Sequence, residues 1–570
     1  MNPISKTRTS HGWFGFLWPG LLSLCVISLI LGLAFSGLFS QIFEINFSKI
    51  YNNSYLFRVI RFTLYQALLS TVISTFIAIP VARALSRRPN LPGRKSFLRL
   101  ASLSLIVPTI VGVFGIVAVH GRNGWFNQAL SFFDLTAGNY LYGLIGILIA
   151  HVFFNAPLLS RIFLQTLEAL PQEYWRSTAQ LNMSGKDIFK LIEWPMLRRV
   201  LPASCGLVFL LCFTSFTVVL ALGGGPSTNT LEVAIYQAIR LDFDIPKAVI
   251  LALTQLFFCA TLLFIGSRFA RNIPLGNTEQ QPAKRFDAKK PAAIAIDTIM
   301  LIAMSLLVFP PLLATAQKAF STRFFTVLGD EKLWSASFNS LMISLAAGTL
   351  TLLLAIGIAL MLRSLELPSR LGKKNYAKPL SAITDFSGSI ILLLPPFVLA
   401  TGLFISLKGM ANLSALAPFL VVTVNSLMAL PFALRILIPS FETSAQNSDL
   451  LCRSLGINSL NRVRVVDWPQ NKKALGLTFG LSTALSTGDL SVIALFGTQD
   501  FTTLPLFMYQ KMGSYRLDDA AIIAFFLCTQ SLLLFTVIER TIAGHWSLSS
   551  FGFPKTKSLK PQKEDVPNRV

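Results

Sequence analysis

Long apolar segments constrain the fold of this chain more strongly than any other feature of its sequence. There are twelve of them, each about 20 residues long, which is the length that an α-helix needs to cross a bilayer. Backbone groups in a bilayer must be hydrogen-bonded within the protein, so an isolated apolar segment can cross only as a helix. The sequence therefore predicts an all-α integral membrane protein with about 12 transmembrane helices. The predicted spans cover residues 17–39, 60–85, 103–120, 140–164, 200–222, 248–269, 293–314, 337–362, 388–407, 416–438, 474–496 and 520–538.

The distribution of charge predicts how these spans are oriented. The 570 residues are 53% hydrophobic and 13% charged, which fits a polytopic membrane protein, yet the net charge is +23. With the N-terminus inside, 37 of the 49 lysine and arginine residues fall on the cytoplasmic side, as the positive-inside rule requires. Topology explains the basic charge, so no nucleic-acid partner is predicted and both termini are expected in the cytoplasm. The first span is too long for the apolar core of a signal peptide, and we predict that it is retained.

Motifs for catalysis or metal binding are not found in the sequence. The six cysteines form no CxxC pair and the four histidines are scattered, so neither a disulfide framework nor a metal site is predicted. Gly185-Lys186 and Gly372-Lys373 lack the upstream glycine and the following hydroxyl of a phosphate-binding loop. The chain is therefore predicted to be neither an enzyme nor a cofactor protein, and energy for transport must come from other chains.

A polar loop occurs twice, once in each half of the chain. Residues 166–199 align without a gap to residues 440–473, at an offset of 274 residues. The alignment superimposes identical residues at several positions, including Glu168 on Glu442, Trp194 on Trp468 and Pro195 on Pro469. Each half has six predicted spans, an even number, so both halves have the same orientation and form a parallel repeat. The predicted organisation is a first repeat in residues 1–275, a cytoplasmic connector in 276–292, a second repeat in 293–545 and a basic tail in 546–570.

Each copy of the loop has the pattern of two short helices joined by a turn. Asn182 and Gly456 occupy the equivalent turn position, and glycine and asparagine are the residue types that best tolerate a left-handed backbone. The second helix has an apolar face in both copies, which includes Ile188, Phe189 and Val463. The prolines at 195 and 469 suit the first turn of the following span. The alternative is an amphipathic loop on lipid, but lipid adhesion would not require the same ungapped pattern twice.

One acidic residue stands out within a predicted span. Asp489 falls in the segment 474–496, and a carboxylate at such depth is costly enough to indicate a function. We predict that it faces a translocation pathway and meets a cationic substrate. The alternative is a residue that packs helices or forms a gate. Its counterpart in the first half is Ser215, so the pathway does not need an acid from both halves.

The first loop, which contains LEALPQEYWRSTAQLNMSGKDIFKLIEWP, resembles the cytoplasmic coupling loop of binding-protein-dependent ABC importer permeases. Further segments, including AHVFFNAPLLSR, LCFTSFTVVLALGGGP and STGDLSVIALFGTQDFTTLP, extend the likeness over nearly the whole chain. They resemble the fused two-domain permeases of the iron(III) and thiamine importers. This resemblance implies the type I ABC importer permease fold in a bacterial inner membrane. It also implies two copies of an ATP-binding subunit, docked on the two loops, and a periplasmic solute-binding protein that delivers the substrate.

The resemblance favours thiamine and its phosphates as the small-molecule cargo, carried across the membrane lipid while a separate ATPase hydrolyses ATP. Ferric iron or another small solute is the alternative cargo within the same class. A proton- or ion-coupled secondary transporter can also have twelve spans in two parallel halves. Such carriers usually place their paired cytoplasmic signature between the second and third spans of each half. The repeated loop here lies between the fourth and fifth predicted spans, which favours the importer class.

Overall fold

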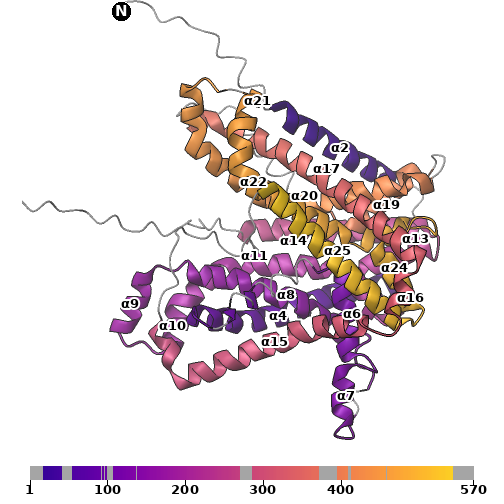
Figure 1. The fold of residues 1–570 in the computed structure, drawn as a ribbon, viewed down its shortest axis with the longest axis horizontal. Coiled ribbons are helices and arrows are strands. Elements are labelled where there is room, and N and C mark those ends of the chain that lie inside the picture. The colour runs from indigo at the N-terminus through magenta and orange to yellow at the C-terminus, as the bar shows by residue number, and fades with distance from the viewer. Residues whose placement is uncertain are drawn as a thin grey trace, which may run out of the picture.

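The computed structural model of the chain describes residues 17–41, 54–91, 93–94, 97–98, 107–135, 138–269, 285–370, 394–408, 413–457 and 459–543. In these ranges every regular element is a helix and none is a β-strand, which confirms the predicted all-α membrane fold. The long helices are arranged in two lobes, which lie apart at one end of the molecule and meet at the other (Figure 1).

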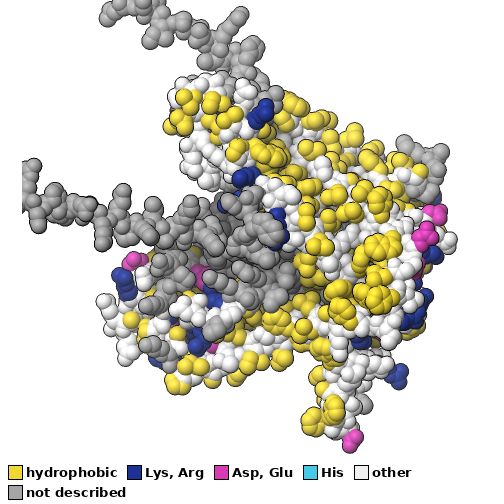
Figure 2. All heavy atoms as spheres, in the orientation of Figure 1, with side chains coloured by type: hydrophobic (Ala, Val, Ile, Leu, Met, Phe, Trp, Pro, Cys, Tyr) yellow, Lys and Arg dark blue, Asp and Glu magenta, His cyan; other side chains and the backbone are white. Residues whose placement is uncertain are grey.

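Nine helical segments of the described chain are long and apolar enough to cross a membrane. They correspond to nine of the twelve predicted spans, and the shares of these segments that face outward are rich in apolar side chains. Figure 2 shows hydrophobic side chains over the flanks of the two lobes, with most of the visible charged side chains toward the two ends. The helices concerned are α2 (Leu17–Ser40), α4 (Ser54–Arg87), α8 (Leu144–Glu168), α11 (Trp194–Phe213), α14 (Ile245–Phe269), α15 (Pro291–Ala319), α17 (Glu331–Arg370), α20 (Leu413–Ser454) and α25 (Leu517–Ala543).

The other three predicted spans are represented by shorter or more polar helices. α6 (Thr109–His120) and α19 (Pro396–Leu407) have 12 residues each and begin directly after Pro108 and Pro395, whose backbones are extended. Residues 101–106 and 371–393, which precede them, lie outside the described residues. α22 (Trp468–Thr487) is rich in Gly, Ser and Thr. The membrane fold is therefore clear, while the count of twelve spans stays a prediction.

The predicted spans 200–222 and 474–496 are not continuous helices. The first divides into α11 and α12 (Thr217–Leu222), and the second into α22 and α23 (Ser491–Phe496). Hydropathy alone gave no sign of these interruptions, because the apolar residues run on through both of them.

The short elements gather at the two ends of the lobes (Figure 1). We call the end that carries both repeated loops the loop face, and the opposite end the far face. The loop face carries α9 (Gln172–Gln180), α10 (Gly185–Ile188), α21 (Ser459–Arg462) and the π-helical turns η2 (Phe189–Glu193) and η5 (Val463–Asp467). The remaining short elements are α7 (Trp125–Ser131), η3 (Pro226–Thr228), α13 (Leu231–Arg240), η4 (Phe286–Lys289), α16 (Phe324–Leu328) and α24 (Leu504–Gly513). Both loops lie at one face, as a parallel repeat requires.

The two halves exchange their first helices. α2 packs against α17 and α19 of the second half, whereas α15 packs against α4 and α6 of the first half. The boundary between the lobes in space is thus not the predicted boundary between the repeats in sequence. Glycines allow the close approach of α2: a Cβ atom at Gly37 would collide with the carbonyl oxygen of Gly402, and one at Gly402 with that of Ala34.

We expect Gly37→Leu to loosen the docking of α2 on the second half. Overpacking of this kind costs about 1–3 kcal/mol. Ser36 and Ser406, whose hydroxyl oxygens lie 3.4 Å apart, can be changed to cysteine to report the contact by cross-linking. Gly32→Leu on the same helix is the matched control, because a Cβ atom there meets nothing within 4 Å. Gly37→Leu should lower both the cross-linking yield and the unfolding temperature in detergent, and an unchanged yield would contradict the assigned packing.

Candidate functional site

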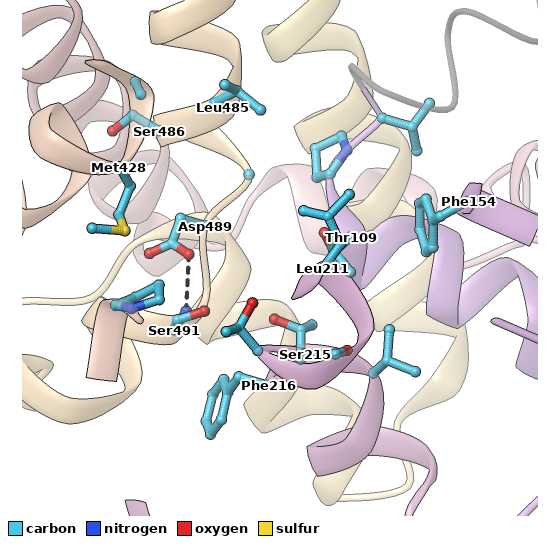
Figure 3. A pocket seen from close by; sticks show the side chains of 18 of the residues that line it. Thr109, Phe154, Leu211, Ser215, Phe216, Met428, Leu485, Ser486, Asp489 and Ser491 are labelled. Atoms are coloured by element: carbon cyan, nitrogen blue, oxygen red, sulfur yellow. Dashed lines mark hydrogen bonds between the residues drawn. The ribbon is translucent and has the colours of Figure 1, made fainter. Parts of the chain in front are cut away.

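A cavity of about 360 Å³ lies between the two halves. Its wall comes from α6, α8, α11 and α12 in the first half and from α19, α20, α22 and α23 in the second. Figure 3 shows Asp489 on one side of this space and Thr109 on the other, with Ser215 and Phe216 between them in the view. A cavity of this size suits a small organic ligand.

Both copies of the repeat interrupt a membrane helix at this cavity. Residues 214–216 separate α11 from α12, and residues 488–490 separate α22 from α23, again at an offset of 274 residues. Irregular backbone is tolerated at membrane depth only where it is buried in protein or lines a cavity, and both interruptions contribute to this wall. Interrupted helices form the substrate sites of many transporters. The cavity is therefore the candidate translocation pathway.

Asp489 lies in the second interruption and stabilises its shape. One carboxylate oxygen accepts a hydrogen bond from the backbone N–H of Ser491 (3.2 Å), and the other accepts one from Val492 (3.1 Å). These N–H groups belong to the first turn of α23 and have no partner within the helix. Asp489 is the only Asp, Glu, Lys or Arg among the described residues that line the cavity. Ser215, its predicted counterpart, lines the same cavity from the first half.

A buried imidazole in the cavity wall is not among the predicted site residues. His151 on α8 is 3% exposed and lines the cavity. Its Nδ1 atom is hydrogen-bonded to the Ser70 hydroxyl (2.9 Å), while its Nε2 atom has no hydrogen-bond partner in the described chain. The residue 274 positions later is Asn425, which also lines the cavity and donates to Ser486 (3.0 Å). A lone histidine carries no motif, so only the repeat register singles out this pair.

Aromatic side chains bound the cavity beside α13. Phe216 lines the cavity, and its ring centroid lies 4.4 Å from that of Phe397 on α19. Tyr236 on α13 packs against both rings, at 5.4 and 6.3 Å. Arg240, at the end of α13, donates to the Gly497 carbonyl (2.9 Å) and so joins the first half to the second. The two halves are therefore in direct contact on this side of the cavity.

The first repeated loop contains a left-handed turn followed by a capped helix. Asn182 has φ 47° and links α9 to α10. Ser184 and Asp187 form a reciprocal capping box: the Asp187 N–H donates to the Ser184 hydroxyl (3.2 Å), and the Ser184 N–H donates to the Asp187 carboxylate (3.3 Å). Such a box satisfies two backbone donors that the helix leaves unpaired. The short helix α10 is thus fixed in place by local sequence.

The second loop repeats the turn and the π-helical turn but not the first helix boundary. Gly456 has φ 66°, so Asn182 and Gly456 both adopt the left-handed backbone expected from the sequence. η5 lies 274 residues after η2. α20, however, runs on through positions where α8 has already ended, because Pro171 of the first loop is replaced by Ala445 in the second. Proline has no N–H to donate and ends a helix, whereas alanine continues it.

Each π-helical turn ends in a buried acidic residue. Glu193 and Asp467 are equivalent in the repeat and are 0% and 1% exposed. Each carboxylate lies near two guanidinium groups: Glu193 near Arg83 (2.5 Å) and Arg285 (2.7 Å), and Asp467 near Arg363 (2.6 Å) and Arg462 (3.8 Å). A buried charge is costly unless it is paired, so these contacts hold each turn against the adjoining membrane helices. Sequence alignment superimposes the two acids but does not identify their partners.

The predicted apolar face of the first loop packs inward. Ile188 is buried, and Phe189 lies against the Trp194 ring and under the Arg83 guanidinium, at 5.9 and 4.3 Å. Val463 in the second loop is half-buried. The apolar side chains that are exposed form three equivalent pairs instead: Leu181 with Leu455, Leu191 with Val465, and Trp194 with Trp468. Sequence periodicity could not separate the inward face from the outward one.

The remaining predicted loop residues occupy the rims of the loops. Glu168 is half-buried and is ion-paired with Arg94. Burial raises the pKa of the Glu168 carboxyl, and the charge of Arg94 offsets part of that shift. Glu442, its equivalent, is also half-buried. Pro195 and Pro469 lie in the first turn of α11 and α22, as predicted.

Comparisons with known proteins agree with this arrangement. Residues 74–274 match the family model described as "Binding-protein-dependent transport system inner membrane component". The chain is 40% identical to the thiamine transport system permease protein ThiP of Escherichia coli strain K12, over 92% of this chain and 96% of the relative. It is 39% identical to ThiP of Haemophilus influenzae, over 91% and 95% of the two chains. A ferric transport system permease protein of the same organism, FbpB 1, is 26% identical over 39% of this chain and 35% of its own.

The likeness to the ThiP proteins thus covers both halves of the chain, including both loops and the cavity, whereas the ferric relative matches less than half. With its many apolar helices, the chain is a multi-pass protein of the inner membrane. It belongs to the family of fused thiamine transport system permeases, within the inner membrane components of binding-protein-dependent transport systems.

Proposed function

We propose that this chain is the permease subunit that moves thiamine across the inner membrane, from a periplasmic binding protein to the cytoplasm. The observation that carries the proposal is the cavity between the halves, whose one charged side chain in the described wall is Asp489. Thiamine is a small aromatic cation, and a cation at membrane depth needs a compensating negative charge. The aromatic side chains of Phe154, Phe216 and Phe432 in the same wall suit a ring-shaped cation.

The chain's own residues supply binding and passage in this proposal. Asp489 balances the positive ring, and His151 and Asn425 offer polar atoms to the uncharged part of the molecule. The contacts among Phe216, Tyr236 and Phe397 close the cavity on the side of α13. Substrate delivered from the periplasm has to pass these rings, so they must separate during each cycle. No covalent step is involved.

The experiment that tests the cargo is uptake into proteoliposomes with the receptor and the ATPase present. Labelled thiamine should accumulate only with ATP, and excess unlabelled thiamine should compete while ferric iron should not. Thiamine phosphate and pyrophosphate, added as competitors, test the phosphates as further cargo. Uptake that follows a proton gradient without ATP would instead identify a secondary transporter, and competition by ferric iron alone would identify the other cargo.

We further propose that the loop face is cytoplasmic, that both termini lie on that side, and that each loop docks one ATPase subunit. The support is the duplicated surface: three equivalent pairs of apolar side chains are exposed on the two loops. Exposed apolar patches on a soluble face mark sites of protein association. One chain with two such loops should recruit two ATPase subunits, and the periplasmic receptor should bind the far face.

We expect purified ATPase to bind inverted membrane vesicles, which expose the cytoplasmic face, and not right-side-out vesicles. Leu181→Asp should reduce the stoichiometry from about two ATPase subunits per chain to about one, because a charge is placed in one apolar contact. Leu455→Asp should do the same, and the double variant should abolish binding. Leu241→Asp, at an equally exposed leucine after α13, is the control. Equal binding to both vesicle orientations would contradict the orientation, and full binding by the double variant would contradict the docking surface.

A further inference from the structure

The described part of the connector between the two repeats is packed against the first loop. Arg285 and Asp287, which lie directly before α15, are 7% and 2% exposed. The sequence predicts a polar linker here, and linkers are normally solvated. Two buried charged residues at this point are therefore unusual and need a structural reason.

Arg285 contacts three different elements of the first half. Its guanidinium group pairs with Glu193 of η2 (2.7 Å) and donates to the Ser86 hydroxyl of α4 (3.3 Å). It also lies over the ring of Trp175 on α9, at 4.0 Å from the centroid. Asp287 accepts two further hydrogen bonds from it, at 2.8 and 3.0 Å. The hydrogen bonds and charges of Asp287 and Glu193 raise the pKa of Arg285, although burial alone would lower it.

The second loop shows what Arg285 replaces. In that loop Arg462, which is part of the loop itself, lies near Asp467 and Asp449. The position equivalent to Arg462 in the first loop is Ile188, which is buried and has no charge. Both buried acids also pair with an arginine of the second span of their half. The first loop therefore lacks its own second guanidinium group, and the connector provides it.

The connector is held on its other side as well. Asp287 pairs with Arg87 of α4 (3.2 Å), and Asp297 in α15 pairs with Arg87 (3.0 Å) and Arg88 (3.2 Å). Arg285 and Arg87 together lower the pKa of Asp287, against the effect of its burial. The first loop, the end of α4 and the start of α15 thus form one network of buried charges. We call this set, Arg83, Arg87, Arg88, Glu193, Arg285, Asp287 and Asp297, the connector network.

We propose that Arg285 is a positioning residue of the first loop, and that the connector network links the movement of this loop to α15 of the second half. α15 packs against α4, α6 and α25, so a displacement of the loop is passed to helices of both halves. The second loop has no such link through Arg462. The geometric part of this proposal is independent of cargo, and its consequence for transport rests on the docking of an ATPase at the loops.

Hydrogen–deuterium exchange of the purified full-length chain tests the geometric part. Arg285→Ala should increase exchange in residues 172–197 and leave the equivalent residues 446–471 unchanged. The rescue variant is Ile188→Arg in the Arg285→Ala background, which gives the first loop the arrangement of the second and should restore protection. Lys247→Ala, which removes an exposed ion pair with Asp242, is the control for a general effect. Unchanged exchange in the first loop, or an equal increase in both loops, would overturn the proposal.

Transport supplies the second readout. Arg285→Ala should lower ATP-driven uptake about 10-fold, the size typical of losing a hydrogen bond to a charged group, while ATP hydrolysis continues. Arg285→Lys should recover little, because lysine cannot form the same forked contacts or stack on Trp175 in the same way. Restored exchange protection without restored uptake in the rescue variant would overturn the link to α15. If uptake of thiamine failed in the unmodified protein as well, the cargo would be wrong, while the exchange result would stand.

Discussion

Asp489→Asn is expected to lower thiamine uptake about 10- to 100-fold, because interactions with a charged group contribute about 1.5–3 kcal/mol. The substitution keeps the shape of the side chain and leaves one oxygen to accept from the N–H of Ser491 or Val492. It removes the one carboxylate among the described residues of the cavity wall. ATPase subunits should remain bound, because the lesion lies in the pathway and far from the loops. Uptake and co-purification of the ATPase are the two measurements.

Two variants separate the charge of Asp489 from its role in the helix interruption. Asp489→Glu keeps the charge and should retain more uptake than Asp489→Asn. The double variant Asp489→Ser with Ser215→Asp moves the acid to the equivalent position of the first half, which lines the same cavity. Partial recovery of uptake in the double variant would support a role for the charge. If Asp489→Asn transports normally, Asp489 serves only to cap α23.

Much of the membrane fold could be predicted from the sequence, because burial in lipid imposes a simple rule. A span must be long, apolar and helical, so α2, α4 and α25 could be located within a few residues from hydropathy. The duplicated loops could also be predicted, because the ungapped register carries the turn residues Asn182 and Gly456 with it. Both have the left-handed backbone that their residue types favour.

What the sequence could not predict depends on contacts between distant segments. The exchange of α2 and α15 between the halves has no signal in hydropathy, since the apolar surface of a span does not specify a partner. The interruption at Asp489 depends on a side chain that takes over backbone hydrogen bonds within an otherwise apolar run. Glu193 and Arg285 are 92 residues apart in sequence, and only the folded chain brings them together. Candidate site residues on the loops were therefore easier to locate than to orient.

Gly456→Val is expected to uncouple ATP hydrolysis from transport while leaving receptor binding largely intact. Gly456 has φ 66°, and a β-branched residue in this left-handed conformation costs about 1–3 kcal/mol of backbone strain. No atom lies within 4 Å of a Cβ added there, so the cost arises from the backbone and not from crowding. The strain is relieved by moving α21 and η5 relative to α20. The buried pair of Asp467 and Arg363, at 2.6 Å, anchors η5 to α17 and opposes that movement.

The reciprocal exchange of the two turn residues provides the matched controls. Gly456→Asn places in the second loop the residue that the first loop already accepts at φ 47°, and Asn182→Gly does the converse. Both should transport at close to the unmodified rate, whereas Asn182→Val should behave like Gly456→Val. The ratio of thiamine taken up to ATP hydrolysed in proteoliposomes is the measurement, because a fall in that ratio distinguishes uncoupling from loss of protein. Normal coupling in Gly456→Val would show that the loop tolerates a displaced helix, and the turn would then have no part in transmitting ATPase motion.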